Sequence, residues 1–186
     1  MERGGGRRRD AEANRRALLE AAAELLARDP EAGMAAIAEH AGLGRSTLYR
    51  HFPSRTAMLD GLAADVVGRR DAGVEAAIAR DPDTGAVLRA LAAMNVELGV
   101  RYPFLFAHRA AVRPALQAGG DVLTAFLAAA RDRGDVRDDQ PFRWLMATQL
   151  AISLAMIGEV LAGRIAGERA TALLGETLIA LMAPRR

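Results

Sequence analysis

Apolar residues recur three and four positions apart along nearly the whole chain, and no segment alternates apolar and polar residues as a half-buried strand would. Alanine, the residue that costs least in a helix, is abundant. This pattern predicts an all-α fold. The 186 residues are enough for one good-sized domain, or for a small domain joined to a larger one, with a substantial buried core.

The composition excludes several kinds of chemistry. The chain has no cysteine, which removes disulfides, thiolate metal sites and cysteine nucleophiles, and fits a reducing compartment. All 25 basic residues are arginine, so lysine Schiff bases and P-loop lysines are also absent. HExxH and GxSxG motifs are missing, and His40, His51 and His108 form no cluster in the sequence. We therefore expect no enzyme activity, no metal and no cofactor.

The sequence favours a cytoplasmic protein with no membrane partner. Its longest uncharged stretch, Trp144 to Gly158, has 15 residues, fewer than the roughly 18 expected of a membrane span. We interpret this stretch as a buried helix. The basic start, MERGGGRRRD, is not followed by an apolar segment, so it does not resemble a secretory signal.

Proline and glycine divide the chain into about nine expected helices. Residues 1–9 are expected to be a disordered Gly/Arg arm, which either reaches a minor groove of DNA or is only a soluble tail. Residues 10–56 then form a small three-helix domain, and residues 57–186 a larger helical one. Ser54 is placed to cap a long helix that runs to Arg80. The later helices are expected at Thr84 to Arg101, Pro103 to about Ala111, Asp121 to Arg133, Gln140 to Arg164 and Gly167 to Met182.

Residues 33–52 have the spacing of a helix-turn-helix motif. Ala38 is small enough for two helices to cross closely. Gly42, four residues later, can adopt the positive φ that a tight turn requires. Ile37, Leu48 and Phe52 supply the apolar face that packs both helices on the first helix of the domain. These five residues are expected to build the motif, with its second helix beginning near Arg45.

This second helix carries a polar surface suited to DNA. Arg45 can bind guanine O6 and N7, and Thr47 a thymine methyl group or a base edge. Tyr49 and His51 are suited to phosphates. Residues 45–55 contain three arginines and no acid. The expected DNA-binding residues are Arg45, Ser46, Thr47, Tyr49, Arg50, His51 and Arg55.

The segments RRALLEAAAELLARDP and GLGRSTLYRHFPSRTAML, within residues 10 to 65, resemble the first helix and the signature of TetR/AcrR-type transcriptional regulators. The resemblance implies a two-fold dimer that binds a palindromic operator, and a helical C-terminal domain that binds a small effector. It places Arg45, Ser46, Thr47 and Tyr49 on contacts with bases or phosphates, and His51 and Arg55 on contacts with phosphates. Gly33 and Gly44 occupy positions where the family usually has Ser or Thr, so operator binding is expected to depend more on arginines, and hence on salt.

Two C-terminal helices have the pattern of a dimer interface. Both carry apolar or small residues at four, three, four spacing, and the first is apolar nearly all round, so it needs burial on two sides. The alternative is that both helices only complete a monomeric core. The expected interface residues are Leu150, Leu154, Ile157, Leu161, Ala170, Leu174, Thr177 and Leu181.

Methionine and aromatic residues gather in the C-terminal part, where adaptable Met side chains and flat rings suit a cavity for an apolar ligand. The same residues at helical spacing are also common in a plain core. Asn95, Glu97, His108 and Gln149 are possible polar anchors. The expected effector-binding residues are Met94, Tyr102, Phe104, Phe106, His108, Trp144, Met146 and Gln149.

Together these features predict a one-component transcriptional regulator. We expect a repressor that binds double-stranded operator DNA as a homodimer and is released by a small, largely apolar effector. A transcriptional activator and a non-specific DNA-binding protein without an effector remain open. So does a helical enzyme or carrier, although its catalytic residues are not found.

Overall fold

The computed structural model describes residues 3–107 and 121–185. Within these ranges the chain forms nine helices and no strands, as the spacing of apolar residues predicts. The helices are α1 (Arg3–Arg28), α2 (Met34–His40), α3 (Arg45–His51), α4 (Arg55–Arg80), α5 (Thr84–Arg101), α6 (Pro103–Ala107), α8 (Asp121–Asp132), α9 (Phe142–Leu161) and α10 (Gly167–Met182).

Local capping chemistry sets many of these boundaries. Ser54 Oγ accepts a hydrogen bond from the Ala57 amide at 3.1 Å and begins α4, as predicted. Asp83 caps α5 in the same way, through Ala86 N at 2.8 Å. Gly42, Gly134 and Gly163, which follow α2, α8 and α9, have φ values of +66°, +83° and +68°. Each occupies the left-handed position that closes the preceding helix.

The N-terminal end of the chain differs from our expectation. We expected residues 1–9 to be a disordered arm, but α1 begins at Arg3 and runs without interruption to Arg28. Once the helix from Asp10 onward exists, each added residue gains a helical hydrogen bond without a new nucleation cost. The arginines at positions 7–9 add little cost in a helix, whereas the glycines at positions 4–6 disfavour it.

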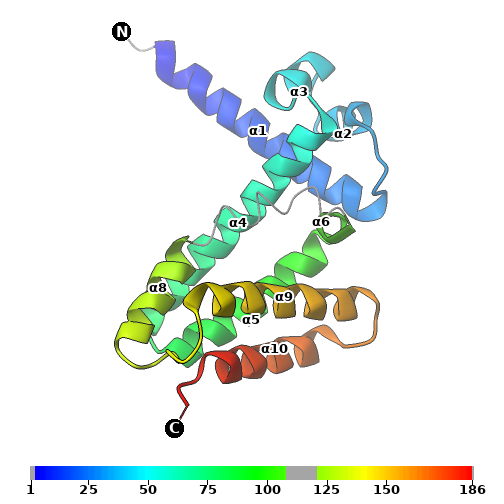
Figure 1. The fold of residues 1–186 in the computed structure, drawn as a ribbon. Coiled ribbons are helices and arrows are strands. Elements are labelled where there is room, and N and C mark those ends of the chain that lie inside the picture. The colour runs from blue at the N-terminus through cyan, green and yellow to red at the C-terminus, as the bar shows by residue number, and fades with distance from the viewer. Residues whose placement is uncertain (1–2, 108–120, 186) are drawn as a thin grey trace.

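Two hydrophobic cores organise the molecule around α4 (Figure 1). One end of α4 joins α1, α2 and α3, and its other end approaches α8. The C-terminal core lies among α4, α5, α8, α9 and α10. The N-terminal core does not end at residue 56, because Met58, Leu59, Leu62 and Ala63 of α4 belong to it. Tyr102, at the end of α5, and residues 104–105 of α6 also pack into this N-terminal core.

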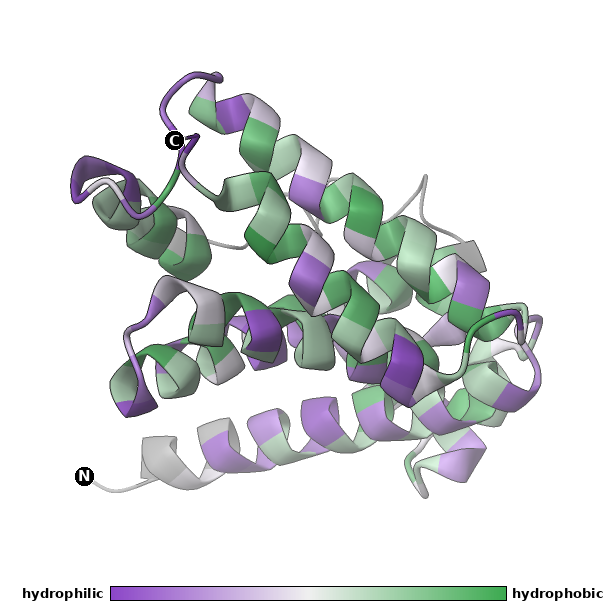
Figure 2. Cartoon of the chain, turned by 90° about the horizontal axis from the view of Figure 1, so that it is seen from below, coloured by the Kyte–Doolittle hydropathy of each residue, from purple (hydrophilic) through white to green (hydrophobic). Residues whose placement is uncertain are grey.

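Helix α9 is less buried within one chain than its composition suggests. Figure 2 shows apolar residues on most turns of α9 and α10. Of the helices in the described ranges, α9 alone is long and apolar enough to cross a membrane, with a mean hydropathy of 1.5 over its best window. This is weak evidence for a span, because core helices of soluble proteins pass the same test. Only 22% of that window is buried, so much of the apolar surface of α9 has no partner within the chain.

Candidate nucleic-acid interface and ligand cavity

Helices α2 and α3 are joined by a tight turn built on glycine. Gly42 N donates to Glu39 O at 3.0 Å, and Leu43 N donates to Ala38 O at 2.9 Å. This pair of bonds is the helix-ending pattern that needs a left-handed residue at position 42. The turn brings Ala38 and Leu48 into the same core, where Ile37 and Phe52 are also buried. Four of the five motif residues named from the sequence therefore lie at the inner side of the motif, and the fifth, Gly42, forms the exposed turn.

The outer side of α3 is polar and accessible. Arg45, Ser46, Tyr49 and Arg50 are exposed, and Thr47 is half-buried. Tyr49 is 50% exposed, unusual for so large an apolar ring. Helix α3 is short, and Leu48 is its one buried residue. Its exposed side chains can therefore face a DNA groove.

His51 lies differently from its neighbours on α3. Its Nε2 atom is buried and has no hydrogen-bond partner in the described part of the chain. Burial lowers the pKa of His51 below its ordinary value, and the charges of Arg50 and Arg15 lower it further. The ring is therefore favoured in its neutral form. A phosphate contact, if it forms, has to use Nδ1.

Arg55 is already engaged in holding the domain together. Its guanidinium group donates to the backbone carbonyls of Pro30 and Ala32, in the connection between α1 and α2. These bonds tie the start of α4 to that connection. Contact of Arg55 with a phosphate stays a prediction, since two of its N–H groups serve the fold.

Gly33 and Gly44 are the N-cap residues of α2 and α3. Both have the extended backbone of an N-cap, and neither helix has a side-chain capping hydrogen bond. The first amides of α3 therefore lack the hydroxyl partner that Ser or Thr would provide.

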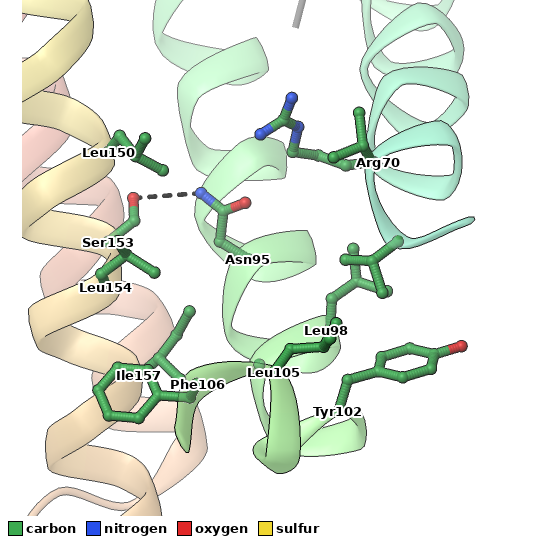
Figure 3. Close-up of a pocket in the computed structure, with 13 residues that line it drawn as sticks. Arg70, Asn95, Leu98, Tyr102, Leu105, Phe106, Leu150, Ser153, Leu154 and Ile157 are labelled. Atoms are coloured by element: carbon green, nitrogen blue, oxygen red, sulfur yellow. Dashed lines mark hydrogen bonds between the residues drawn. The ribbon is translucent and has the colours of Figure 1, made fainter. Parts of the chain in front are cut away.

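A cavity of about 90 Å³ lies between α4, α5, α6 and α9 (Figure 3). We call it the central cavity. Most of its wall is apolar, and its polar groups come from Arg70, Asn95, Tyr102 and Ser153. The lining residues are Val66, Val67, Arg70, Asn95, Leu98, Gly99, Tyr102, Leu105, Phe106, Leu150, Ser153, Leu154 and Ile157.

A short chain of hydrogen bonds crosses one side of the central cavity. Asn95 Nδ2 donates to Ser153 Oγ at 3.1 Å, and Ser153 Oγ donates to the Gln149 carbonyl at 2.8 Å. The Gln149 side chain is buried, and its Oε1 atom has no partner within the described ranges. The hydrogen bond between Asn95 and Ser153 links α5 to α9 at the cavity wall.

The predicted effector-binding residues are only partly gathered at this cavity. Tyr102 and Phe106 line it. Phe104 packs in the N-terminal core, and Met94 and Met146 pack against the C-terminal core. Gln149 is buried one turn from Ser153. Trp144 is 59% exposed, and His108 lies outside the described residues. Apolar spacing alone did not reveal that α4 contributes Val66, Val67 and Arg70 to the cavity.

The residues predicted for a dimer interface differ in burial. Ala170 and Leu174 are fully buried within the chain, so they do not face a partner copy. Leu150, Leu154 and Ile157 line the central cavity, and Leu150, Leu154 and Leu181 are half-buried. Leu161 and Thr177 are exposed. The burial of Ala170 and Leu174 has a simple cause: the regular apolar spacing of α10 marks the side that packs within the chain. The residues exposed on the other side are mostly small, and they are Trp144, Ala147, Ala151 and Ala155 of α9 and Ala172, Glu176 and Ala180 of α10.

Comparisons with known proteins agree with this geometry. Residues 18–62, which span the motif and the start of α4, match the model of the TetR family of bacterial regulatory proteins. Over these residues the chain is similar to TetR-type regulators. A curated relative, the HTH-type transcriptional repressor LfrR of Mycolicibacterium smegmatis, is 40% identical over 98 residues. That match covers 51% of this chain and 50% of LfrR, so it spans about half of the length of that relative.

Solved structures of TetR-type proteins extend the likeness to most of the chain. LfrR from Mycobacterium smegmatis, solved in complex with proflavine, is 27% identical, with a TM-score of 0.65 over 92% of this chain and 97% of that one. RolR, solved with resorcinol, is 18% identical, with a TM-score of 0.73 over 95% and 91%. A TetR-family regulator from Marinobacter aquaeolei is 22% identical, with a TM-score of 0.71 over 96% and 100%. The last two show the shared fold alone.

Proposed function

We propose that this chain is a cytoplasmic TetR-type transcriptional repressor that binds a palindromic operator as a homodimer and releases it when a small, largely apolar molecule enters the central cavity. One observation carries the proposal: Tyr102 and Leu105 belong both to the wall of the cavity and to the N-terminal core. A change in the cavity therefore reaches the packing of the DNA-binding domain directly.

DNA recognition is assigned to the outer side of α3. Arg45, Ser46, Thr47 and Tyr49 reach bases and phosphates when the helix enters the major groove, and Arg50 adds a phosphate contact. Two copies of α3 in a dimer meet successive major grooves on one side of the duplex, which lie roughly 34–36 Å apart. A palindromic operator follows from the two-fold symmetry.

The dimer is assigned to the exposed side of α9 and α10. The low burial of α9 within one chain leaves an apolar surface that a second copy can cover. Alanines 147, 151 and 155 lie along that surface at helical spacing, and their small side chains permit close approach of two helices.

Effector release is assigned to a displacement of α4. A volume of about 90 Å³ is well below the roughly 300 Å³ of common ligand sites, so a ligand must push the walls apart. On one side, α9 is held by its packing with α5 and α10. On the other side, α4 carries α1, α2 and α3 at its far end (Figure 1). Movement of α4 changes the distance between the two copies of α3, and ligand binding then favours the spacing that does not fit the operator. Proflavine, the ligand of the LfrR structure, is aromatic, which supports an aromatic ligand here.

The test is binding of the purified chain to its own upstream intergenic DNA, with a scrambled sequence as competitor. We expect Arg45→Ala with Tyr49→Ala to weaken specific binding at least about 100-fold, since each good base contact contributes roughly 1–3 kcal/mol. Arg80→Ala, an exposed arginine at the opposite end of α4, is the charge control and should bind as the wild type does. Full affinity of the double variant, or equal binding to the scrambled DNA, would contradict the proposal.

A further inference from the structure

The charge of the central cavity indicates which ligands it accepts. Of its described lining residues, Arg70 alone carries a charge. Asn95, Tyr102 and Ser153 are neutral, and no carboxylate lines the wall. A ligand that enters this space meets one cation, Arg70, and no carboxylate of the lining, although Asp71 pairs with Arg70 from outside the lining.

Arg70 is held at the cavity and keeps hydrogen-bonding capacity. Its side chain is only 13% exposed. Nε and Nη2 both approach the same oxygen of Asp71, at 3.4 and 3.2 Å, which are long distances for an ion pair. Nη1 has no hydrogen-bond acceptor in the described ranges. In Figure 3 the guanidinium extends from α4 toward the side of the cavity where Asn95 lies.

Apart from Asp71, which pairs with Arg70, the carboxylates near the lining residues in the sequence are directed elsewhere. Asp65 pairs with Arg69 at 2.7 Å and lines a separate surface groove on the other side of α4. Glu97 is exposed on α5. Residues 108–120, whose structure is not described, contain two arginines, one histidine and no acid, so they bring no carboxylate to any part of the molecule.

We propose that the ligand of the central cavity is a small aromatic carboxylate whose carboxyl group is bound by Arg70. Arginine presents paired N–H groups that match a carboxylate, and a partly buried site strengthens such a bond. The ring lies against the apolar wall, between Phe106 and Ile157 on one side and Leu98 on the other. A cationic ring of the same shape meets Arg70 with a like charge, and Asp71, the counter-ion of Arg70, does not line the cavity, so the cationic ring is rejected. This inference rests on the proposed use of the cavity as the effector site.

The test compares three planar molecules of nearly equal shape: benzoate, benzamide and benzamidinium, which carry charges of −1, 0 and +1. The corresponding naphthalene series covers larger ligands. Binding to the full chain is measured by calorimetry and by the increase in melting temperature, both without DNA. We expect the carboxylate of at least one series to bind at least about tenfold more tightly than its amide, the effect of one charge-assisted hydrogen bond, and the amidinium not to bind.

Arg70→Gln should abolish the preference for the carboxylate and leave amide binding unchanged, and Arg70→Lys should restore part of it. Arg69→Gln makes the same change of charge on the neighbouring residue, outside the cavity, and should keep the wild-type preference. Preferential binding of the amidinium, an unchanged preference in Arg70→Gln, or no carboxylate binding in either series would overturn the inference. A chain that binds carboxylates but does not release operator DNA would instead contradict only the release step of the proposed function.

Discussion

Gly61 of α4 lies directly against the ring of Phe52, the residue that ends α3. A methyl group at position 61 would come within 2.6 Å of Phe52 Cε1, much closer than two carbon atoms can approach. The guanidinium of Arg15 lies 4.8 Å from the centre of the same ring, from the side of α1. Glycine at position 61 thus allows α1, α3 and α4 to meet around one aromatic side chain. Helix α3 is thereby held against α4, the helix that borders the central cavity.

Gly61→Ala is therefore expected to destabilise the chain. The added methyl group forces Phe52 or α4 to move, and such overpacking costs roughly 1–3 kcal/mol. The free energy of unfolding, from urea denaturation, measures this loss, and operator affinity should fall as well because α3 is displaced. Gly68→Ala is the matched control, since a methyl group there meets no atom within 4 Å. It should stabilise α4 by up to about 1 kcal/mol, as alanine does in place of glycine in a helix. If both variants had equal stability, the close contact of Gly61 with Phe52 would not be important.

The sequence predicted the fold well because its signals are local. Ser54 as a helix cap, Gly42 as a turn residue and the apolar period of each helix depend on neighbours a few positions away. The central cavity was harder to predict because it depends on how helices are placed around α4. Arg70 lies in the long helix that follows the motif, and nothing in its neighbours along the chain indicates that it reaches a cavity wall formed also by α5 and α9.

The dimer residues illustrate a related limit. Apolar periodicity shows that one side of α10 is buried, but it does not distinguish burial within a chain from burial between chains. Leu174 follows the period and is fully enclosed in its own chain. The exposed side of α9 carries small residues such as Ala151 and Ala155. Alanine occurs on both buried and exposed sides of helices, so the sequence pattern does not mark this side as an interface.

The glycine caps provide a second prediction, about gain of function. Gly44→Ser places a hydroxyl at the start of α3, where the backbone is already extended and the nearest atom to a new Cβ is Ser46 Oγ at 3.9 Å. We expect a stability gain of a few tenths of a kcal/mol, because serine is a slightly better N-cap than glycine. The hydroxyl also adds a neutral contact for a phosphate, so operator affinity should rise without a steeper dependence on salt.

Gly42→Ser tests whether the expected gain depends on the N-cap position of Gly44. Gly42 has a φ of +66°, which costs a residue with a side chain roughly 1–2 kcal/mol. This variant should lose stability and operator affinity together, although the same hydroxyl is added only two residues away. Equal behaviour of the two serine variants, measured by denaturation and by titration of operator DNA with salt, would rule out a capping effect.

The lowered pKa of His51 predicts how the stability of the fold changes with pH. Burial and the charges of Arg50 and Arg15 hold the pKa of His51 in the folded chain below its ordinary value of 6.5. The unfolded chain thus binds this proton more readily than the folded chain does. The stability that depends on neutral His51 is complete above about pH 6.5 and is lost as the pH falls from there through the lower folded-state pKa.

His51→Leu should remove this contribution. We expect the free energy of unfolding to fall less between about pH 7.5 and pH 5.5 in the variant than in the wild type. Ser46→Ala, an exposed change on the same helix, should keep the wild-type dependence. An identical loss in His51→Leu and the wild type would show that protonation of His51 is not opposed by folding.

The exposed side of α9 leads to the last prediction, and Trp144 reports on it directly. This residue is the single tryptophan of the chain and is 59% exposed in one copy. If a second copy covers this side, Trp144 is removed from water, so the wild type should show blue-shifted emission and weak quenching by acrylamide. Ala151→Arg places an unpaired charge two turns further along the same side of the helix, and we expect it to yield a monomer in sedimentation with strongly quenched tryptophan. Ala93→Arg makes the same change at an exposed position of α5 and should remain a dimer. A dimer that survives Ala151→Arg with its tryptophan fluorescence unchanged would show that the two copies meet on another surface, and the small exposed residues of α9 would then need a different explanation.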